Sequence, residues 1–214
     1  MLEHFTWYKQ SGYRWRGDGL TVYIDPWELT GDPEPADVIF ITHAHYDHYS
    51  PDDLGQIRKD TTPIVAPRDV AAELSGDVTA VGAGDTVEAA GVKAQVVPAY
   101  NIVPEREEAH PKANGWVGYI LELGGATCYH AGDTDHLPEL EDVRANLAFL
   151  PIGGTYTMEP AEAGGLAKKI GPEIAVPMHY GFVVGSPSLA EEFRREAEPV
   201  TVEILQPERS FEQT

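Results

Sequence analysis

Three histidines and one aspartate lie within six residues, in the segment His-Ala-His-Tyr-Asp-His that begins at His43. The short apolar run 38–41 leads into this cluster and predicts a strand. Ser50 follows the cluster, with Pro51 and two aspartates behind it, and this order predicts the first turn of a helix. The cluster therefore lies where a strand ends and a helix begins. With only eight histidines in 214 residues, such a cluster is improbable by chance.

The spacing of the cluster suits two adjacent metal ions. Residues two apart in an extended segment point to the same side, so His43 and His45 project together. As the chain turns into the helix, Asp47 and His48 reach a neighbouring position. Neutral imidazole and carboxylate oxygen are the ligands expected for zinc in a site that keeps an open position. The alternative is a polar loop with incidental histidines, and its buried members would then need other partners.

The rest of the chain predicts two sheets. Apolar runs alternate with Gly- and Pro-containing turns, without a fixed-period repeat or a low-complexity tract. Strands are expected at 20–24, 38–41, 63–66, 78–81, 92–97, 117–123, 126–129, 147–150 and 174–176, and helices after Ser50, at 68–74, at 159–170 and after a capping box that begins at Ser188. This order suggests two sheets packed face to face with helices outside. The aromatic stretch 5–15 is expected to be an edge strand of the first sheet, with an interface as the alternative.

Charge and composition restrict the partners of the chain. Asp and Glu number 35 against 15 Lys and Arg, and the formal charge of −20 argues against nucleic-acid binding. No apolar run approaches the roughly 20 residues of a membrane helix, and no secretory signal is visible, so no membrane partner is expected. The single cysteine, Cys128, fits a reducing compartment and buried packing, and a cytoplasmic location is expected. A high-salt environment and an ordinary acidic enzyme both fit the charge.

Two further candidate ligands follow predicted strands. Asp133 comes after the run 126–130 and the turn-forming Gly132, and His179 comes after 174–176 and Pro177. Rigid strand ends suit metal ligands, whereas a turn-capping aspartate and a core histidine are the alternatives. Beside the cluster at His43, the ligand interpretation is favoured for both residues.

The motif His-x-His-x-Asp-His resembles that of the metallo-β-lactamase superfamily, and further residues between 25 and 179 fit the family pattern in order. The resemblance implies an α/β fold, a four-layer αββα sandwich formed as one domain over 1–214. The site residues it implies are His43, His45 and His110 on one metal, Asp47, His48 and His179 on the other, Asp133 as the bridging carboxylate, and Asp25 as support for a metal-binding histidine. Because His110 lies in a charged, loop-like stretch, a surface histidine is the alternative there.

Within the superfamily, the chain resembles the small metal-dependent hydrolases related to the ascorbate-6-phosphate lactonase and N-acyl phosphatidylethanolamine phospholipase branches. The likeness rests on the segments 98–101, 130–135 and 150–158. Tyr156 is expected to contact the substrate, unless it packs under its own loop. His130 is expected either to support the site or to be satisfied in the core. Asp133 in place of cysteine argues against β-lactam hydrolysis, and His45 in place of glutamate argues against diiron redox chemistry.

These features predict a dinuclear metal hydrolase for a small-molecule substrate. Two divalent cations, zinc or alternatively manganese or iron, would hold a bridging water or hydroxide that attacks a phosphodiester, lactone or other ester. Asp47 and Asp133 are the expected catalytic carboxylates. Asp47 would orient the nucleophile and take its proton. The leaving oxygen would be protonated by water or by a neighbouring group such as His130, if it points inward.

Some alternatives stay open at this stage. A phosphate substrate is expected to use one of Arg106, Lys112, Arg58 and Lys59 in addition to the metals. A non-catalytic, metal-dependent sensor of a small ligand on the same fold is the competing function, and a structural protein with one metal is a third. Assembly into a homo-oligomer is also left open.

Overall fold

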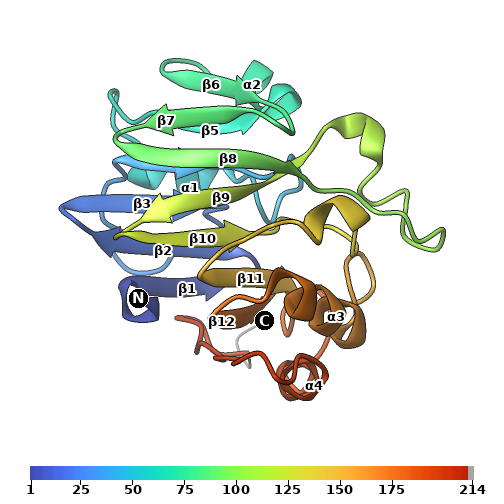
Figure 1. The fold of residues 1–214 in the computed structure, drawn as a ribbon. Coiled ribbons are helices and arrows are strands. Elements are labelled where there is room, and N and C mark those ends of the chain that lie inside the picture. Colours follow the sequence, from blue (N-terminus) through green and yellow to red (C-terminus); the bar gives the residue numbers. More distant parts are fainter. Residues whose placement is uncertain (212–214) are drawn as a thin grey trace.

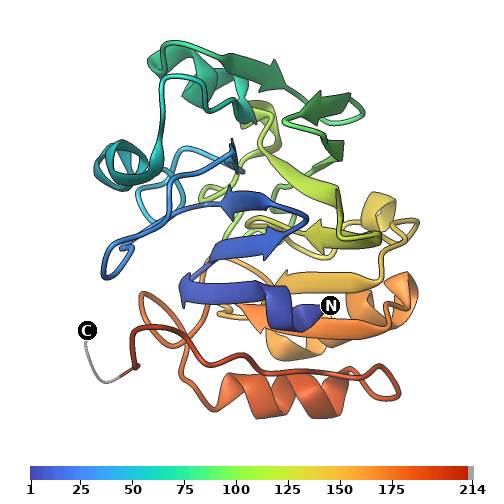
Figure 2. The same cartoon turned by 90° about the vertical axis from the view of Figure 1, so that its left-hand side faces the viewer.

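The computed structural model describes residues 1–211. In this part of the chain two six-stranded sheets lie face to face, with helices outside them (Figures 1 and 2). The first sheet has the order β1-β2-β3-β4-β5-β6, formed by Phe5–Lys9, Gly12–Gly17, Leu20–Ile24, Val38–Phe40, Ile64–Pro67 and Val78–Val81. Strands β1, β2 and β3 are antiparallel, whereas β3, β4, β5 and β6 are parallel.

In the second sheet, too, neighbouring strands follow one another in sequence, and the order across the sheet is β12-β11-β10-β9-β8-β7. Its strands are Thr86–Ala89 (β7), Val92–Pro98 (β8), Val117–Leu123 (β9), Ala126–His130 (β10), Leu147–Pro151 (β11) and Ile174–Met178 (β12). Strands β7 to β10 are antiparallel, and β10, β11 and β12 are parallel. Each sheet therefore has a parallel part, and strands of these parts end at the edge that carries the candidate site.

Among residues 1–211, three α-helices join strands, α1 (Pro51–Ile57), α2 (Arg68–Glu73) and α3 (Pro160–Ile170), and α4 (Leu189–Glu196) follows β12. Short 3-10 helices cover Leu2–His4, Lys112–Asn114 and Pro138–Leu140. Within residues 1–211, the helices are all too short or too polar to cross a bilayer.

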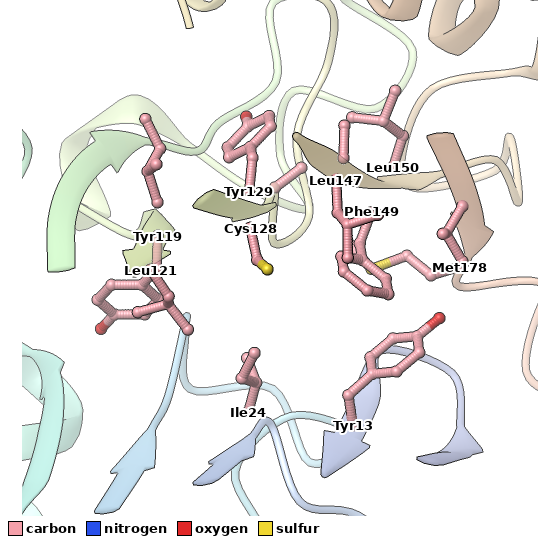
Figure 3. Close-up of a cluster of buried hydrophobic side chains, with 14 of the residues drawn as sticks. Tyr13, Ile24, Tyr119, Leu121, Cys128, Tyr129, Leu147, Phe149, Leu150 and Met178 are labelled. Carbon is pink, nitrogen blue, oxygen red and sulfur yellow. The ribbon is translucent and has the colours of Figure 1, made fainter. Parts of the chain in front are cut away.

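The space between the sheets is filled by large apolar side chains (Figure 3). Tyr13 and Ile24 of the first sheet point toward Cys128 and Phe149 of the second, and the rings of Tyr13 and Phe149 lie 4.8 Å apart. Such aromatic pairs add to the burial of apolar area, which is the main stabilising contribution to the fold. The packed side chains between the sheets therefore fix how the edge of one sheet, where its strands end, lies against the corresponding edge of the other.

The centre of the first sheet, at β4 and β5, is buried on both faces because α1 and α2 cover its outer side. Along β4 and the residue after it, Val38 and Phe40 belong to the core between the sheets, whereas Ile39 and Ile41 pack with Leu54 of α1 and other outer residues. A strand covered on both faces is apolar throughout, as this run is. The burial of this run fixes the point at which the histidine cluster leaves the sheet.

The expected two-sheet architecture with outer helices is confirmed, and the aromatic stretch 5–15 forms β1, at the edge of the first sheet, and most of β2. Strand β7 was not expected. It is a short edge strand of mostly exposed residues, so it carries little apolar pattern. The predicted capping box at Ser188 is wrong: Ser188 has a helical backbone, and its hydroxyl contacts the Ser186 hydroxyl at 2.7 Å. A reciprocal contact of that kind occurs at α3, where the Glu162 carboxylate accepts the N–H of Glu159 at 2.7 Å.

Candidate metal centre

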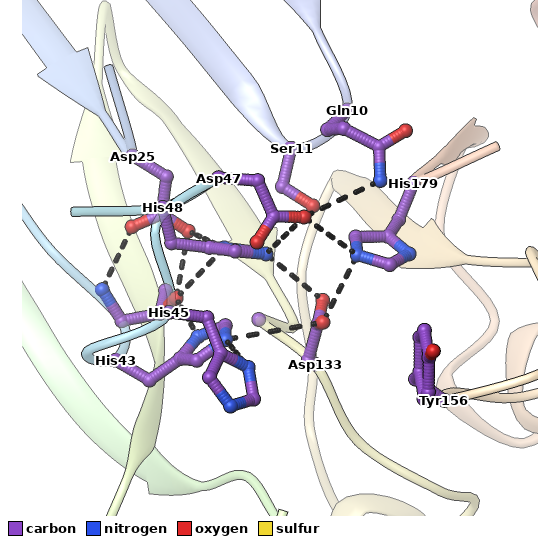
Figure 4. Close-up of polar contacts among 12 residues, drawn as sticks. Gln10, Ser11, Asp25, His43, His45, Asp47, His48, Asp133, Tyr156 and His179 are labelled. Atoms are coloured by element: carbon purple, nitrogen blue, oxygen red, sulfur yellow. Dashed lines mark hydrogen bonds and ion pairs between the residues drawn. The ribbon is translucent and has the colours of Figure 1, made fainter. Parts of the chain in front are cut away.

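The candidate ligands come together where strands of both sheets end (Figure 4). The histidine cluster follows β4, Asp133 follows β10, and His179 follows β12 directly. The carboxyl ends of parallel strands share an edge, so residues far apart in sequence meet there. All of these side chains are buried or half-buried at one end of the space between the sheets.

Asp133 lies at the centre of the cluster. Its Oδ2 lies 3.0 Å from Nε2 of His179 and 3.2 Å from Nε2 of His110, and its Oδ1 lies 3.4 Å from Nε2 of His48. Oδ2 is also 3.9 Å from Nε2 of His43. One carboxylate therefore faces histidines that are predicted to belong to two different metals.

The donor atoms form two groups whose members lie within 4.8 Å of one another. The first group is His43, His45, His110 and Asp133, and the second is Asp47, His48 and His179. This division matches the assignment that the sequence resemblance implies. His110, which lacked a strand of its own, is buried within the first group and is not a surface histidine.

Asp25 fixes the orientation of two histidines from behind the site. Its carboxylate accepts the N–H of Thr42 at 2.8 Å and the Thr42 hydroxyl at 2.6 Å, and it lies 2.7 Å from Nδ1 of His48. The same Thr42 hydroxyl lies 2.9 Å from Nδ1 of His43. With both Nδ1 atoms engaged, the Nε2 atoms of His43 and His48 are directed into the cluster.

His110 is held by a loop rather than by a strand. Its Nδ1 lies 3.1 Å from the carbonyl oxygen of Tyr156, and Asn101 donates to that carbonyl at 2.8 Å. The backbone N–H of Asn101 also donates to the carbonyl of His110 at 2.8 Å. Asn101 therefore ties the loop of His110 to the loop of Tyr156, and Nε2 of His110 faces Asp133.

The turn between β1 and β2 supports the second donor group through Gln10. The Gln10 carbonyl accepts the N–H of His179 at 3.0 Å, and its side-chain amide donates to Oδ2 of Asp47 at 3.5 Å. His179 has a positive φ of 55°, and an added Cβ on Gly153 would lie only 2.4 Å from its carbonyl oxygen. The position of His179 thus depends on Gln10 and on the missing side chain of Gly153.

Sequence reasoning assigned no role to Gln10, Thr42 or Asn101. Asn101 and Thr42 lie in segments that the motifs singled out, but their contacts cross between distant parts of the chain. Gln10 is a buried amide in a hairpin turn, and nothing in the local sequence relates it to residues 47 and 179.

The electrostatics of the cluster are those of carboxylates enclosed by imidazoles. Burial would raise the pKa of Asp47, but the neighbouring His48 and His179 outweigh it and lower the pKa to about 2. Burial would lower the pKa of His179, but Asp133 and Asp47 raise it to about 9. Burial, with His48 nearby, lowers the pKa of His43 well below its usual value. The carboxylates of Asp47 and Asp133 therefore stay ionised, and they attract positive charge to this edge of the fold.

The donor set fits metal ions. Nε2 of His48, Nε2 of His110 and Oδ1 of Asp133 are buried, and their contacts within the cluster do not have hydrogen-bond geometry, so among the described residues they have no hydrogen-bond partner. Buried polar atoms are seldom left unpaired, and these three atoms face the same cluster. Imidazole nitrogen and carboxylate oxygen are ordinary ligands of zinc and related divalent metals.

His130 is a core residue and not a proton donor to the site. Its Nε2 lies 2.9 Å from the carbonyl oxygen of Ser11, and its Nδ1 accepts the N–H of Gly132 at 3.3 Å. Burial lowers the pKa of its imidazole. Because both nitrogens contact backbone groups, His130 does not meet the condition of pointing inward that a proton donor to the leaving group requires, and its contacts are those of a strand histidine satisfied in the core.

A cavity of about 300 Å³ opens onto the cluster. Its lining residues are His45, Tyr46, Asp47, Ala109, His110, Asp133, Tyr156, His179 and Val183. Tyr156 is 46% exposed and stands beside the cluster in Figure 4, so it does not pack under its own loop.

Comparison with known proteins agrees with this geometry. The family model described as the beta-lactamase superfamily domain matches residues 4–179. The chain belongs to the metallo-β-lactamase superfamily. Within this superfamily it is 34% identical to a UPF0173 metal-dependent hydrolase of Methanopyrus kandleri, over 97% of this chain and 98% of that protein. The protein is thus a member of the UPF0173 metal-dependent hydrolases.

Solved structures show the same superfamily fold. A protein of Parabacteroides distasonis assigned as a metal-dependent hydrolase is 32% identical, with a TM-score of 0.83 over 95% of this chain and 93% of that one. Igni18, a metallo hydrolase of Ignicoccus hospitalis, is 24% identical, with a TM-score of 0.74 over 95% and 94% of the two chains. The second likeness is one of fold alone.

Proposed function

We propose that this metal-dependent hydrolase binds two divalent cations and cleaves an ester-type bond of a small molecule. The observation that carries the proposal is the position of Asp133, whose carboxylate faces His110 of one donor group and both His48 and His179 of the other. A central carboxylate between two complete donor groups is the arrangement that a dinuclear site needs.

The residues that would hold the cations follow from the two donor groups. His43, His45 and His110 would hold one ion, Asp47, His48 and His179 the other, and Asp133 would contact both. Zinc is the expected metal, with manganese and iron as alternatives. When bound, such ions supply Lewis acidity toward a substrate oxygen and make water a nucleophile near neutral pH.

Asp47 has the geometry of a group that orients the attacking water. Its carboxylate lines the cavity, and Gln10 donates to its Oδ2. With a pKa lowered to about 2, it is ionised at neutral pH and can accept a hydrogen bond from water. As the water oxygen bonds to the electrophilic carbon or phosphorus, its proton passes by way of Asp47 to solvent, which leaves Asp47 ionised again, and the bond to the leaving oxygen breaks. Solvent supplies the proton that the leaving oxygen takes up.

The test is turnover by the metal-loaded protein on chromogenic carboxylic esters, lactones and phosphodiesters. We expect hydrolysis that chelation abolishes, and loss of activity in Asp133→Ala with an unchanged circular dichroism spectrum. Asp60→Ala, which removes an exposed carboxylate that does not line the cavity, is the matched control and keeps full activity. Absence of turnover across the panel contradicts the proposal.

The same preparation separates the competing functions. A protein that binds metal and a small ligand tightly, yet turns over none of the panel, is a sensor. A metal content of one equivalent per chain indicates a single structural ion.

A further inference from the structure

The cavity walls divide into two chemically distinct parts. The floor carries the candidate ligands, such as Asp133 and His179, whereas the remaining lining residues are Tyr46, Ala109, Tyr156 and Val183. We call Tyr46, Tyr156 and Val183 the apolar rim. They come from three separate segments: the histidine cluster, the loop before α3 and the loop after β12.

The apolar rim is exposed to an unusual degree for such side chains. Tyr46 is 63% exposed, Tyr156 46% and Val183 40%. Among the described residues the only other exposed large hydrophobic side chains are Met1, at 38%, and Ile102, at 48%, and neither lines the cavity. Exposed apolar side chains that gather around one opening mark a binding surface rather than random surface composition.

Each rim residue is held by a contact with another segment, Tyr46 through its ring and Tyr156 and Val183 through their backbones. The ring of Tyr46 meets the edge of the buried Trp27 ring, with centroids 5.7 Å apart. The carbonyl of Tyr156 accepts from Asn101 at 2.8 Å, and the N–H of Val183 donates to Oε1 of Gln10 at 3.4 Å. Because the backbone at these positions is already held, binding of a hydrocarbon group costs less ordering of the rim.

No lysine or arginine of the described residues lines the cavity. The two nearest in sequence to His110 are already paired: Arg106 with Asp135 and Glu162, and Lys112 with the Tyr100 hydroxyl at 2.9 Å. The other two basic residues suggested for a phosphate are also paired, Arg58 with the Ser75 carbonyl and Lys59 with Asp37. A phosphate group would thus find no side-chain cation beyond the metal ions, and the net charge of −20 repels anions at longer range.

From these contacts we infer that the substrate is an uncharged carboxylic ester or lactone whose hydrocarbon part rests on the apolar rim. This inference depends on the proposed hydrolase function and narrows it from three bond types to one substrate class. Tyr46, Tyr156 and Val183 then determine specificity, and the ligands on the cavity floor determine reactivity.

The test is a chain-length series with the zinc-loaded protein: p-nitrophenyl acetate, butyrate and hexanoate, beside bis(p-nitrophenyl) phosphate. Burial of one methylene is worth about fourfold in binding. Because the apolar rim covers only one side of the acyl chain of the substrate, we expect kcat/KM to rise about tenfold from the acetate ester to the hexanoate ester. The phosphodiester is expected to be the poorest substrate.

Variants assign the preference to the rim. Tyr156→Ala is expected to reduce the hexanoate-to-acetate ratio to about threefold or less, whereas Tyr156→Phe keeps it because the ring remains. Ile102→Ala is the matched control, since Ile102 is 48% exposed but lies outside the cavity lining. Calorimetry with hexanoate, acetate and inorganic phosphate gives a readout without turnover, and hexanoate is expected to bind more tightly than acetate to wild type but not to Tyr156→Ala.

The outcomes separate this inference from the proposed function. A flat chain-length series, equal losses on all esters in Tyr156→Ala, or preference for the phosphodiester overturns the substrate class while the hydrolase function stands. Absence of metal-dependent turnover on every substrate overturns both.

Discussion

The contacts of Asp25 allow a sharp prediction for the substitution Asp25→Asn. Asp25 is fully buried and has a φ of 46°, a conformation that asparagine adopts as readily as aspartate. The substitution therefore preserves backbone and volume and changes only one oxygen to an NH2 group. That group cannot accept from both the Thr42 hydroxyl and Nδ1 of His48, which lie 2.6 Å and 2.7 Å from Oδ2 of Asp25.

The expected consequence is a change at His48. Without an acceptor at Nδ1, the proton of the imidazole moves to Nε2, where it occupies the lone pair that faces Oδ1 of Asp133. Loss of such a supporting hydrogen bond lowers metal affinity by about 10- to 100-fold, which corresponds to about 1.4–2.8 kcal/mol. His48 belongs to only one donor group, so one of two metal equivalents should weaken and the other should change much less.

The assay is zinc titration against a chromophoric chelator, with thermal unfolding of the metal-free protein as a check on folding. Asp37→Asn is the matched control, because Asp37 also accepts a backbone N–H, that of Thr21 at 2.9 Å, but lies outside both donor groups. If Asp25→Asn binds both equivalents within twofold of wild type, the reasoning about histidine orientation is refuted.

Two further predictions concern packing. Gly153→Ala would place a Cβ 2.4 Å from the carbonyl oxygen of His179. We expect this clash to destabilise the protein by about 1–3 kcal/mol and to weaken metal binding. The control is Gly82→Ala, which has open space around its Cβ and should change stability by less than about 0.5 kcal/mol. Equal melting temperatures for the two variants would contradict this argument. Burial raises the pKa of Cys128 to about 12, so the folded protein should not react with Ellman's reagent at pH 8, and the unfolded protein should; rapid reaction in the native state would show that the thiol is accessible.

Much of the site could be predicted because its main residues carry a local pattern. The cluster from His43 to His48 has its spacing written in six consecutive residues, and Asp133 and His179 follow recognisable strands. Strands at 78–81 and 117–123 have the predicted bounds. The second strand is buried at every residue but one, which explains its continuous apolar character.

The features of the site and the fold that the sequence did not predict depend mostly on contacts between distant segments. Gln10 supports Asp47 and His179 across 37 and 169 positions, respectively, and no short pattern records such a contact. The place of His130 in the core depends on the carbonyl of Ser11 beside its Nε2, a contact between segments far apart in sequence. The start of α4 after Ser188 agrees with the prediction, but the capping contact does not, because the Ser188 hydroxyl contacts Ser186 instead.

The most direct test of the central claim is a crystal structure of the zinc-loaded protein with anomalous difference density collected at the zinc edge. The two donor groups predict two peaks, one beside His43, His45 and His110 and one beside Asp47, His48 and His179, with Asp133 between them. A single peak, or peaks only outside this cluster, would contradict a dinuclear centre.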